Sequence, residues 1–325
     1  MKPLLKAPRY KVEPTAPIYL GGGINTYGTP FNIKEGEARD SRNTSSRSYP
    51  ALSVRPGIDD AFTAITTPNA LGQRNNQYPH VQDGTVWKAW NGTAWVNVQT
   101  GLTSATGKFV EFATGTTLYT ILANGTDVYS WDGTTAASIA DAPKTKLYAV
   151  HKGRVYALLG KELKFSALNL ITDWTTVLDA GSISITNAKG DGTAISEFDD
   201  QVYVWTAQSF HNLYGTGPLN YTLSDISDDG CISDRSVIEG KYNGAKALYF
   251  MDYGWVKAFS GSSPVRVSHS VKKFIDGINL TYKDKVCAGK NGKYLYWAIP
   301  YETTENNVVL EYDTDLNIWN VHGYE

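Results

Sequence analysis

The chain repeats itself from about residue 80 onward, and this repeat limits its fold more than any other feature. A Leu-Tyr or Val-Tyr pair recurs at residues 118–119, 155–156, 202–203, 248–249 and 295–296, at intervals of 37, 47, 46 and 47 residues. A second apolar segment follows each pair after a short turn, and an earlier copy of that segment lies at residues 86–90. Repeat units of roughly 40–50 residues with several short strands are typical of propeller blades.

The turns between the apolar segments share the pattern Asp/Asn-Gly-Thr, which begins at Asp83, Asn91, Asn124, Asp132 and Asp191. Asp or Asn followed by Gly tolerates the positive φ of tight hairpin turns, so we expect a hairpin at each position. Several segments are apolar at nearly every position, which suits strands covered on both faces by neighbouring blades. Long helices are not expected, because apolar residues rarely recur with a helical period for more than two turns.

The sequence therefore predicts one all-β domain. We expect an extended, Pro-rich N-terminal arm and lead-in strand over residues 1–66 and a β-propeller of about six blades over residues 67–325. Six copies of the second apolar segment can be counted from Val86 to Tyr312. Because the last copy ends close to the C-terminus, we expect a strand from residues 51–66, or the neighbouring blade, to close the ring.

The first part of the chain differs in composition from the rest. It holds seven of the 13 prolines within 56 residues, and proline favours extended chain laid over a surface. Residues 1–47 have a net charge of +4, which leaves −6 for the remainder. A basic arm on an acidic body predicts docking on a neighbouring subunit; a solvated terminus is the alternative interpretation. The expected interface residues are Lys2, Lys6, Arg9 and Lys11.

Residue patterns that would carry catalysis or bind a cofactor are not found. No two of the five histidines are spaced i, i+4, and none lies beside Cys231 or Cys287, so a zinc site is not expected. Asp225 and Asp229 stand before Gly230 at calcium-loop spacing, but the twelfth position is Ser236 instead of the bidentate Glu. We therefore expect no catalytic residue and no cofactor, and Asp225 and Asp229 form only an incomplete metal site.

Other function classes have little support in the sequence. Propeller glycosidases need two placed carboxylates, or in sialidases a cluster of arginines, and no feature brings the arginines of this chain together. The acidic body disfavours contact with DNA. No apolar run approaches the roughly 18 residues of a membrane span, the first residues lack the apolar stretch of a signal peptide, and two cysteines form no disulfide framework. These features favour a protein made in a reducing compartment.

Two segments carry a resemblance. The first runs through Gly22-Gly23-Ile24-Asn25-Thr26, Glu35-Gly36-Glu37-Ala38-Arg39-Asp40, Asn43 and Arg55-Pro56-Gly57, and the second is Gly230-Cys231-Ile232-Ser233-Asp234-Arg235-Ser236-Val237. The first resembles the opening of tailed-bacteriophage structural proteins, and the second resembles the later blades of phage tail hub, nozzle and tail-associated propeller proteins. Pro50 departs from the pattern, since many relatives have Gly there. The chain also stops soon after the last blade, whereas relatives often carry further domains.

The resemblance implies a non-enzymatic structural component of a bacteriophage particle. Such a protein would be a tail or head-tail connector adaptor that is assembled in the host cytoplasm and binds other virion proteins, in a symmetric ring. Two alternatives stay open: a host-surface propeller that binds or cleaves carbohydrate, and a cellular protein-interaction propeller. The carbohydrate alternative predicts exposed tryptophan around a cleft with paired carboxylates.

Overall fold

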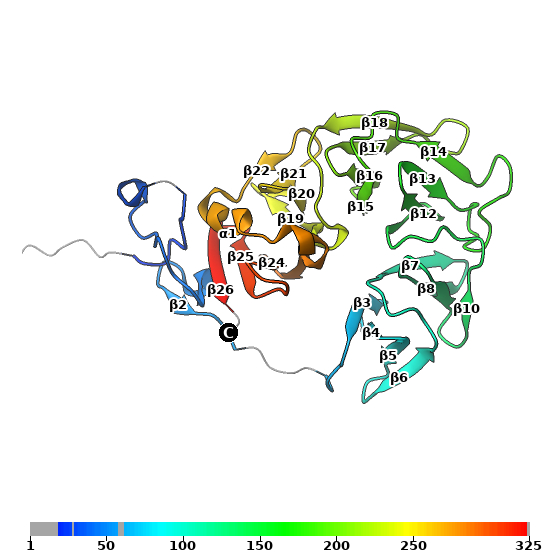
Figure 1. Cartoon of the computed structure of the whole chain (residues 1–325), viewed down its shortest axis with the longest axis horizontal. Helices are drawn as coiled ribbons and strands as arrows, with labels where there is room; N and C mark the ends of the chain where they lie inside the picture. The colour runs from blue at the N-terminus through cyan, green and yellow to red at the C-terminus, as the bar shows by residue number, and fades with distance from the viewer. Residues whose placement is uncertain (1–18, 28, 58–61, 324–325) are drawn as a thin grey trace, which may run out of the picture.

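The computed structural model describes residues 19–27, 29–57 and 62–323 of the 325-residue chain. Six antiparallel four-stranded sheets follow one another, and within each sheet the strands are neighbours in sequence order. Figure 1 shows these sheets arranged around a common centre, with the first strand of a sheet near the centre and the fourth at the rim. The fold is a six-bladed β-propeller, which confirms the predicted fold class and blade number.

The blades are numbered here in chain order, and each is a simple antiparallel meander. Blades 1 to 3 consist of β3 (Pro68–Arg74), β4 (Tyr78–Asp83), β5 (Val86–Trp90), β6 (Trp95–Gln99); β7 (Lys108–Thr114), β8 (Thr117–Ala123), β9 (Val128–Trp131), β10 (Ala136–Ser138); and β11 (Tyr148–His151), β12 (Arg154–Leu159), β13 (Glu162–Phe165), β14 (Gly181–Ser184). Blades 4 to 6 consist of β15 (Gly192–Phe198), β16 (Gln201–Thr206), β17 (Phe210–Tyr214), β18 (Thr222–Ser227); β19 (Ile238–Tyr242), β20 (Ala245–Met251), β21 (Val256–Phe259), β22 (Val265–Arg266); and β23 (Cys287–Asn291), β24 (Tyr294–Ile299), β25 (Val308–Asp313), β26 (Ile318–Gly323).

The two apolar segments of each repeat are the second and third strands of a blade. In β20, Tyr249 and Met251 belong to the core shared with blade 6, whereas Leu248 and Phe250 belong to the core shared with blade 4. Successive side chains of a strand point to opposite faces, so a strand covered on both faces is apolar throughout. First and fourth strands such as β19 and β22 are more exposed, which explains why the sequence revealed only two strands per repeat.

Four of the five Asx-Gly-Thr segments form hairpin turns. Their glycines have φ values from 58° to 109°: Gly84, Gly92, Gly125 and Gly133. In one of these turns the Asn91 side-chain oxygen accepts hydrogen bonds from the N–H groups of Thr93 and Ala94, at 3.0 and 2.8 Å. The hairpin predicted at Asp191 is wrong, because Gly192 begins β15 and the segment connects blade 3 to blade 4. A glycine is needed there for packing, since an added Cβ would lie 2.4 Å from Leu158.

Helical structure is sparse in the part of the chain that the structure describes. The one α-helix is α1 (Lys272–Asp276), which follows blade 5. The 3₁₀ turns are η1 (Pro30–Asn32), η2 (Ser46–Ser48), η3 (Asp234–Ser236), η4 (His269–Val271) and η5 (Leu280–Lys285). Among the described residues, no helix has the length and apolar character needed to cross a membrane.

The ring of blades is packed at five junctions. Separate hydrophobic clusters join blades 1 and 2, 2 and 3, 3 and 4, 4 and 5, and 5 and 6. Within the described ranges, no such cluster joins blade 6 to blade 1. Among the described residues of 51–66, none belongs to a blade: β2 (Ser53–Val54) pairs with β1 (Thr44–Ser45), and blade 6 takes all four strands from residues 287–323. Residues 287–323 already supply a complete four-stranded blade, so blade 6 needs no strand from the N-terminal part of the chain.

Candidate functional site

The residues that carry the first resemblance form a strap, defined as residues 19–27 and 29–57, which crosses the outer edge of blade 6. The edge strand β26 has backbone carbonyls without a partner strand, and the strap supplies donors for them. The N–H of Ile24 donates to Trp319 O and that of Asn43 donates to Val321 O, both at 2.8 Å. Figure 1 shows β2 beside β26 on the outer side of the ring. The strap therefore protects an edge that would otherwise be open to pairing with other chains.

The strap contacts both faces of blade 6. On one face, Ile24 is 2% exposed and joins the hydrophobic cluster between blades 5 and 6. On the other face, the Ser45 hydroxyl donates to the Glu311 carboxylate at 2.8 Å, and the Ser46 hydroxyl donates to Asp313 at 3.1 Å. Both carboxylates are buried, so these hydroxyls supply hydrogen bonds that water would otherwise provide.

Glu311 has several partners under the strap. Its second carboxylate oxygen lies 3.4 Å from Nε2 of His322. Burial raises the pKa of Glu311, but hydrogen bonds from His322 and Ser45 outweigh burial and leave it below its ordinary value. The Ser45 hydroxyl bonds to the carboxylate and not to the imidazole, so this cluster lacks the serine–histidine contact of a nucleophilic triad. Its geometry supports attachment of the strap.

The residues of the second resemblance, 230–237, form a hub at the junction of several blades. The Asp234 carboxylate lies 2.8 Å from Lys108 Nζ of blade 2 and accepts the Ile195 N–H of blade 4 at 2.9 Å. Trp297 Nε1 of blade 6 donates to the Ser236 carbonyl at 3.0 Å. The Ser236 hydroxyl accepts the Met251 N–H of blade 5. One short segment thus connects blades 2, 4, 5 and 6.

Two residues show why the hub has this sequence. A Cβ on Gly230 would lie 1.8 Å from the Ala207 carbonyl oxygen, so only glycine fits. Cys231 is fully buried in the core between blades 4 and 5, and burial raises the pKa of its thiol to about 12. A thiol that stays protonated at neutral pH packs as a small apolar group and is a poor nucleophile.

The hub also lines the central cavity of the propeller, which has a volume of about 470 Å³. Its charged lining groups are Lys108, Asp234 and Arg235, and Lys108 and Asp234 neutralise each other. Arg235 donates to the backbone carbonyl of Asp284. Cys287 also lines the cavity, and burial raises the pKa of its thiol. These groups hold the walls together and provide no activated nucleophile.

Blade 4 contains a serine–histidine–aspartate relay that the sequence did not reveal. Ser209 Oγ lies 2.7 Å from His211 Nε2, and His211 Nδ1 lies 2.7 Å from the Asp225 carboxylate. The strand register places His211 directly opposite Asp225, so only the β17–β18 pairing could have identified the contact. Burial lowers the pKa of His211, although Asp225 opposes this effect. Ser209 is 3% exposed and its hydroxyl is also 2.6 Å from the Thr206 hydroxyl, an arrangement that links strands and offers no access to a substrate.

The two aspartates of the incomplete calcium loop are directed to different partners. Asp225 binds His211 and receives a hydrogen bond from Asn187 at 2.7 Å. Asp229 forms an ion pair with the buried Lys257, which also lies 2.6 Å from Asp252. Among the described residues, no group of three or more His, Cys, Asp or Glu side chains is arranged to hold a metal ion.

Asp229 and Asp252 lie in a surface depression of about 420 Å³ between blades 4 and 5. Tyr253 and Trp255 line it as well, so carboxylates and aromatic rings meet in one place, as the carbohydrate alternative predicts. Lys257 lies between the two carboxylates and neutralises one of their two negative charges. Asp252 also accepts the N–H groups of the turn that follows it, at 2.7 and 2.6 Å, so much of its bonding capacity is structural.

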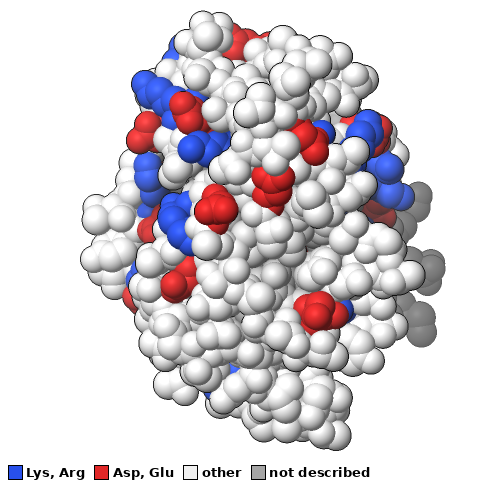
Figure 2. Space-filling model, turned by 90° about the vertical axis from the view of Figure 1, so that its right-hand side faces the viewer, with Lys and Arg blue, Asp and Glu red and all other residues white. Residues whose placement is uncertain are grey.

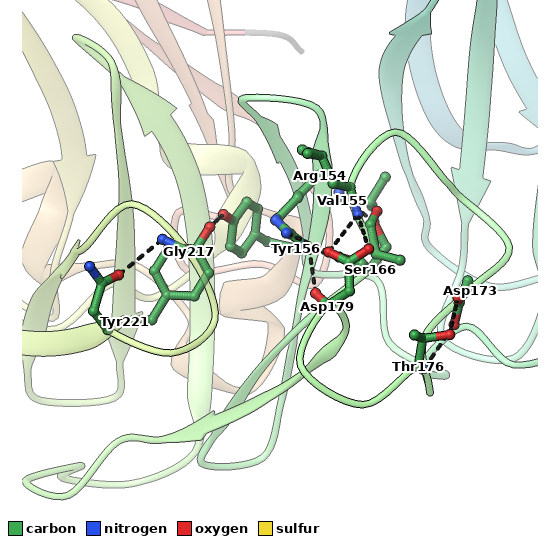
Figure 3. Close-up of polar contacts among 12 residues, drawn as sticks. Arg154, Val155, Tyr156, Ser166, Asp173, Thr176, Asp179, Gly217 and Tyr221 are labelled. Atoms are coloured by element: carbon green, nitrogen blue, oxygen red, sulfur yellow. Dashed lines mark hydrogen bonds and ion pairs between the residues drawn. The ribbon is translucent and has the colours of Figure 1, made fainter.

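A sialidase-type site would need several arginines close together, and the sequence offers Arg55, Arg154, Arg235 and Arg266 for it; these lie in separate parts of the fold. Arg154, in β12, donates to the Asp179 carboxylate at 2.6 Å and to the Ser166 carbonyl at 2.8 Å, and Figure 3 shows its guanidinium directed to these groups. Arg235 belongs to the hub. Arg266 lies over the Trp255 ring, 5.0 Å from its centroid, and Arg55 donates to Asn43 within the strap. These arginines do not form a shared anion site.

The predicted interface residues Lys2, Lys6, Arg9 and Lys11 lie outside the described residues. On the face shown in Figure 2, Lys and Arg are interspersed with Asp and Glu. A mixed surface of this kind provides no continuous positive track for a nucleic-acid backbone on that face.

No family model and no curated protein sequence matches the chain. Solved structures do. Virginiamycin B lyase from Staphylococcus aureus superposes with a TM-score of 0.54 at 10% identity, over 81% of this chain and 86% of that one. The extracellular domain of a hybrid two component system from B. thetaiotaomicron superposes with a TM-score of 0.55 at 12% identity, over 82% of this chain and 35% of that one. At these identities the similarity establishes the fold alone, and the chain is a six-bladed β-propeller.

Proposed function

We propose that this protein is a non-enzymatic structural component of a tailed-bacteriophage particle, a tail or connector adaptor that binds other virion proteins. One observation carries the proposal: both segments that resemble phage structural proteins hold separate parts of the fold together. The strap fixes the start of the described chain to blade 6, and the hub connects four blades. Segments that give rigidity, and do not build a catalytic cleft, suit a protein whose role is mechanical.

The surfaces of the molecule support an assembled state. Blade 1 shares no hydrophobic cluster with blade 6 among the described residues, so one of its sheet faces is not packed on another blade by such a cluster. The basic residues Lys2, Lys6, Arg9 and Lys11 precede the strap. Stable complexes commonly bury roughly 1,600 Å² in total, and an arm that reaches a neighbour enlarges the contact. The proposal locates the protein in the virion, in a symmetric ring assembled in the host cytoplasm.

Deletion of the gene from the phage genome that encodes it tests this function. Electron microscopy of the resulting particles should show heads without complete tails, and a plasmid copy should restore complete particles. Complete and infectious particles formed without the protein would contradict the proposal.

A saccharide-binding propeller is the second candidate, and the depression around Asp229 and Asp252 favours it. Aromatic rings beside carboxylates are common where sugars bind, because the rings stack on the sugar and the carboxylates accept its hydroxyls. The structural proposal expects purified protein to leave host-wall polysaccharide uncut and unbound. Polysaccharide turnover that disappears in Asp229→Asn or Asp252→Asn would move the protein to this class.

A further inference from the structure

Blade 1 has one sheet face that no other blade covers with a hydrophobic cluster. Ala70 and Trp87 point to blade 2 and form the cluster shared with it. Side chains alternate along a strand, so Leu71 and Trp90 point to the opposite face. The register pairs Trp90 with Trp95 across β5 and β6, which places both rings on that opposite face.

This face is aromatic. The Trp90 and Trp95 rings are 5.4 Å apart, and the Phe62 ring lies 5.0 and 5.6 Å from them. Trp95 Nε1 donates to the Thr63 carbonyl at 3.2 Å, which fixes the orientation of the indole. Phe62 remains 42% exposed and Leu71 remains 77% exposed. We call Phe62, Trp90 and Trp95 the aromatic face of blade 1; Leu71 lies on the same side of the sheet, on the innermost strand, where it lines the central cavity.

Blade 6 of the same chain is a poor partner for the aromatic face. The side of blade 6 opposite to its core with blade 5 carries the buried acids Glu311 and Asp313. The strap already occupies that side through Ser45 and Ser46. The aromatic face needs an apolar partner. Contacts between the other blades are stabilised because they remove apolar surface from water.

The N-terminal residues of this chain are of the types that bind aromatic surfaces. Residues 1–18 contain Pro3, Pro8, Pro14 and Pro17 together with Leu4, Leu5, Tyr10, Val12 and Ile18. Aromatic surfaces bind proline-rich segments because proline rings stack on indoles and a pre-extended chain loses little entropy on binding. An extended segment of this length spans about 55 Å. In Figure 1 the strap lies on the outer side of blade 6, away from β4, β5 and β6 of blade 1.

We infer that residues 1–18 of one copy bind the aromatic face of blade 1 on a second copy. The contact joins two different surfaces, so repetition of the same contact builds a closed ring or a filament. The inference rests on the proposed function, because an assembled particle is where many copies meet.

Sedimentation equilibrium of the full-length chain, with and without a synthetic peptide of residues 1–18, tests the inference. The chain should self-associate, and the peptide should return it to monomers, whereas a peptide of the same composition in shuffled order should not. Trp95→Ala should weaken self-association at least about tenfold, as for an aromatic residue central to an interface. Tyr214→Ala, a matched control at a 49% exposed tyrosine of blade 4, should leave it unchanged within about twofold.

Phe62→Glu keeps the test valid if the Trp95 variant does not fold, because Phe62 is already 42% exposed and the charge should weaken association to a similar degree. A chain that is monomeric at all concentrations, or one whose association ignores both variants, overturns the inference. Failure here while the protein is found in particles leaves the proposed function standing. Absence from particles contradicts the proposed function whatever the peptide does.

Discussion

His80 is a buried histidine whose ionisation should link the stability of blade 1 to pH. Its Nδ1 accepts the Trp87 indole N–H at 2.9 Å, and its ring lies 5.3 Å from that of Trp131. Burial, together with the nearby Arg74, lowers the pKa of His80 to about 4. The unfolded chain takes up a proton at this residue below about pH 6.5, and the folded chain does so only near pH 4. Stability from this group is therefore full above pH 6.5 and falls as the pH drops toward 4.

Between pH 7 and pH 5 the loss from His80 should be about 2 kcal/mol. Urea unfolding at pH 7 and at pH 5 measures this loss of stability. His80→Gln keeps a side-chain acceptor for Trp87 but does not titrate, so its stability should fall less over the same interval. Equal losses in the variant and the wild type would show that other groups cause the pH dependence.

The stabilisation that the hub provides should depend on Asp234. Its side chain is 7% exposed and binds both Lys108 and the Ile195 N–H. Asp234→Ala leaves those two groups without their acceptor and should cost about 2–4 kcal/mol in urea unfolding. Asp228→Ala is the matched control, because its ion pair with Lys189 is solvent-exposed and should cost no more than about 0.5 kcal/mol. Similar costs for the two variants would contradict the role assigned to the hub.

At the residue scale, the sequence predicted little of what Asp225 and Asp229 do. Their spacing before Gly230 suggested one shared ion. In the structure, strand pairing places Asp225 beside His211, and Asp229 forms an ion pair with the buried Lys257. Contacts between residues far apart in sequence depend on strand register, and a single sequence carries no signal for it. Gly230 itself was visible in the sequence, but the backbone approach that requires it was not.

The strap is the element whose removal should matter most. Deletion of residues 1–20 removes no described contact of β1 or β26, so the circular dichroism should remain that of β-sheet and Tm should stay within a few degrees. Deletion of residues 1–57 uncovers the edge of β26 and leaves Glu311 and Asp313 without the Ser45 and Ser46 hydroxyls. We expect Tm to fall by at least about 5 °C and aggregation to increase. Equal melting of the two deletion variants would show that the strap does not stabilise the propeller.

Element by element, the sequence predicted the middle strands of the blades and missed their borders. The middle strands are apolar on both faces and therefore visible, as β20 shows, whereas β19 and β22 resemble loops in composition. The hairpin wrongly expected at Asp191 has the same three-residue pattern as the four that are correct. The pattern reports which backbone angles are tolerated, and only the neighbouring strands decide whether a hairpin forms.

At the scale of the molecule, the near-constant repeat was sufficient to predict a propeller of about six blades. The way blade 6 meets blade 1 was not predictable, because it depends on how the strap binds blade 6 and on which residues of blade 1 face away from blade 2. The functional assignment remains a proposal that rests on the two resembling segments.

Assembly should depend on the arm and on salt. A chain lacking residues 1–20 loses Lys2, Lys6, Arg9 and Lys11, which complement an acidic body. Incorporation of this variant into particles should weaken, and the difference from full-length protein should be largest at low salt, because high salt screens the attraction of the arm in the full-length protein as well. Immunoblots of particles purified at low and high salt measure it, with full-length protein as the control. Unchanged incorporation of the variant would show that residues 1–20 do not contribute to assembly.

The most direct test of the central claim is quantitative mass spectrometry of gradient-purified particles made by the genome that encodes this chain. A structural adaptor should be present at a fixed copy number per particle, in constant ratio to the other tail proteins across independent preparations. Particles that are complete and infectious but contain the protein only in trace and variable amounts would contradict the account.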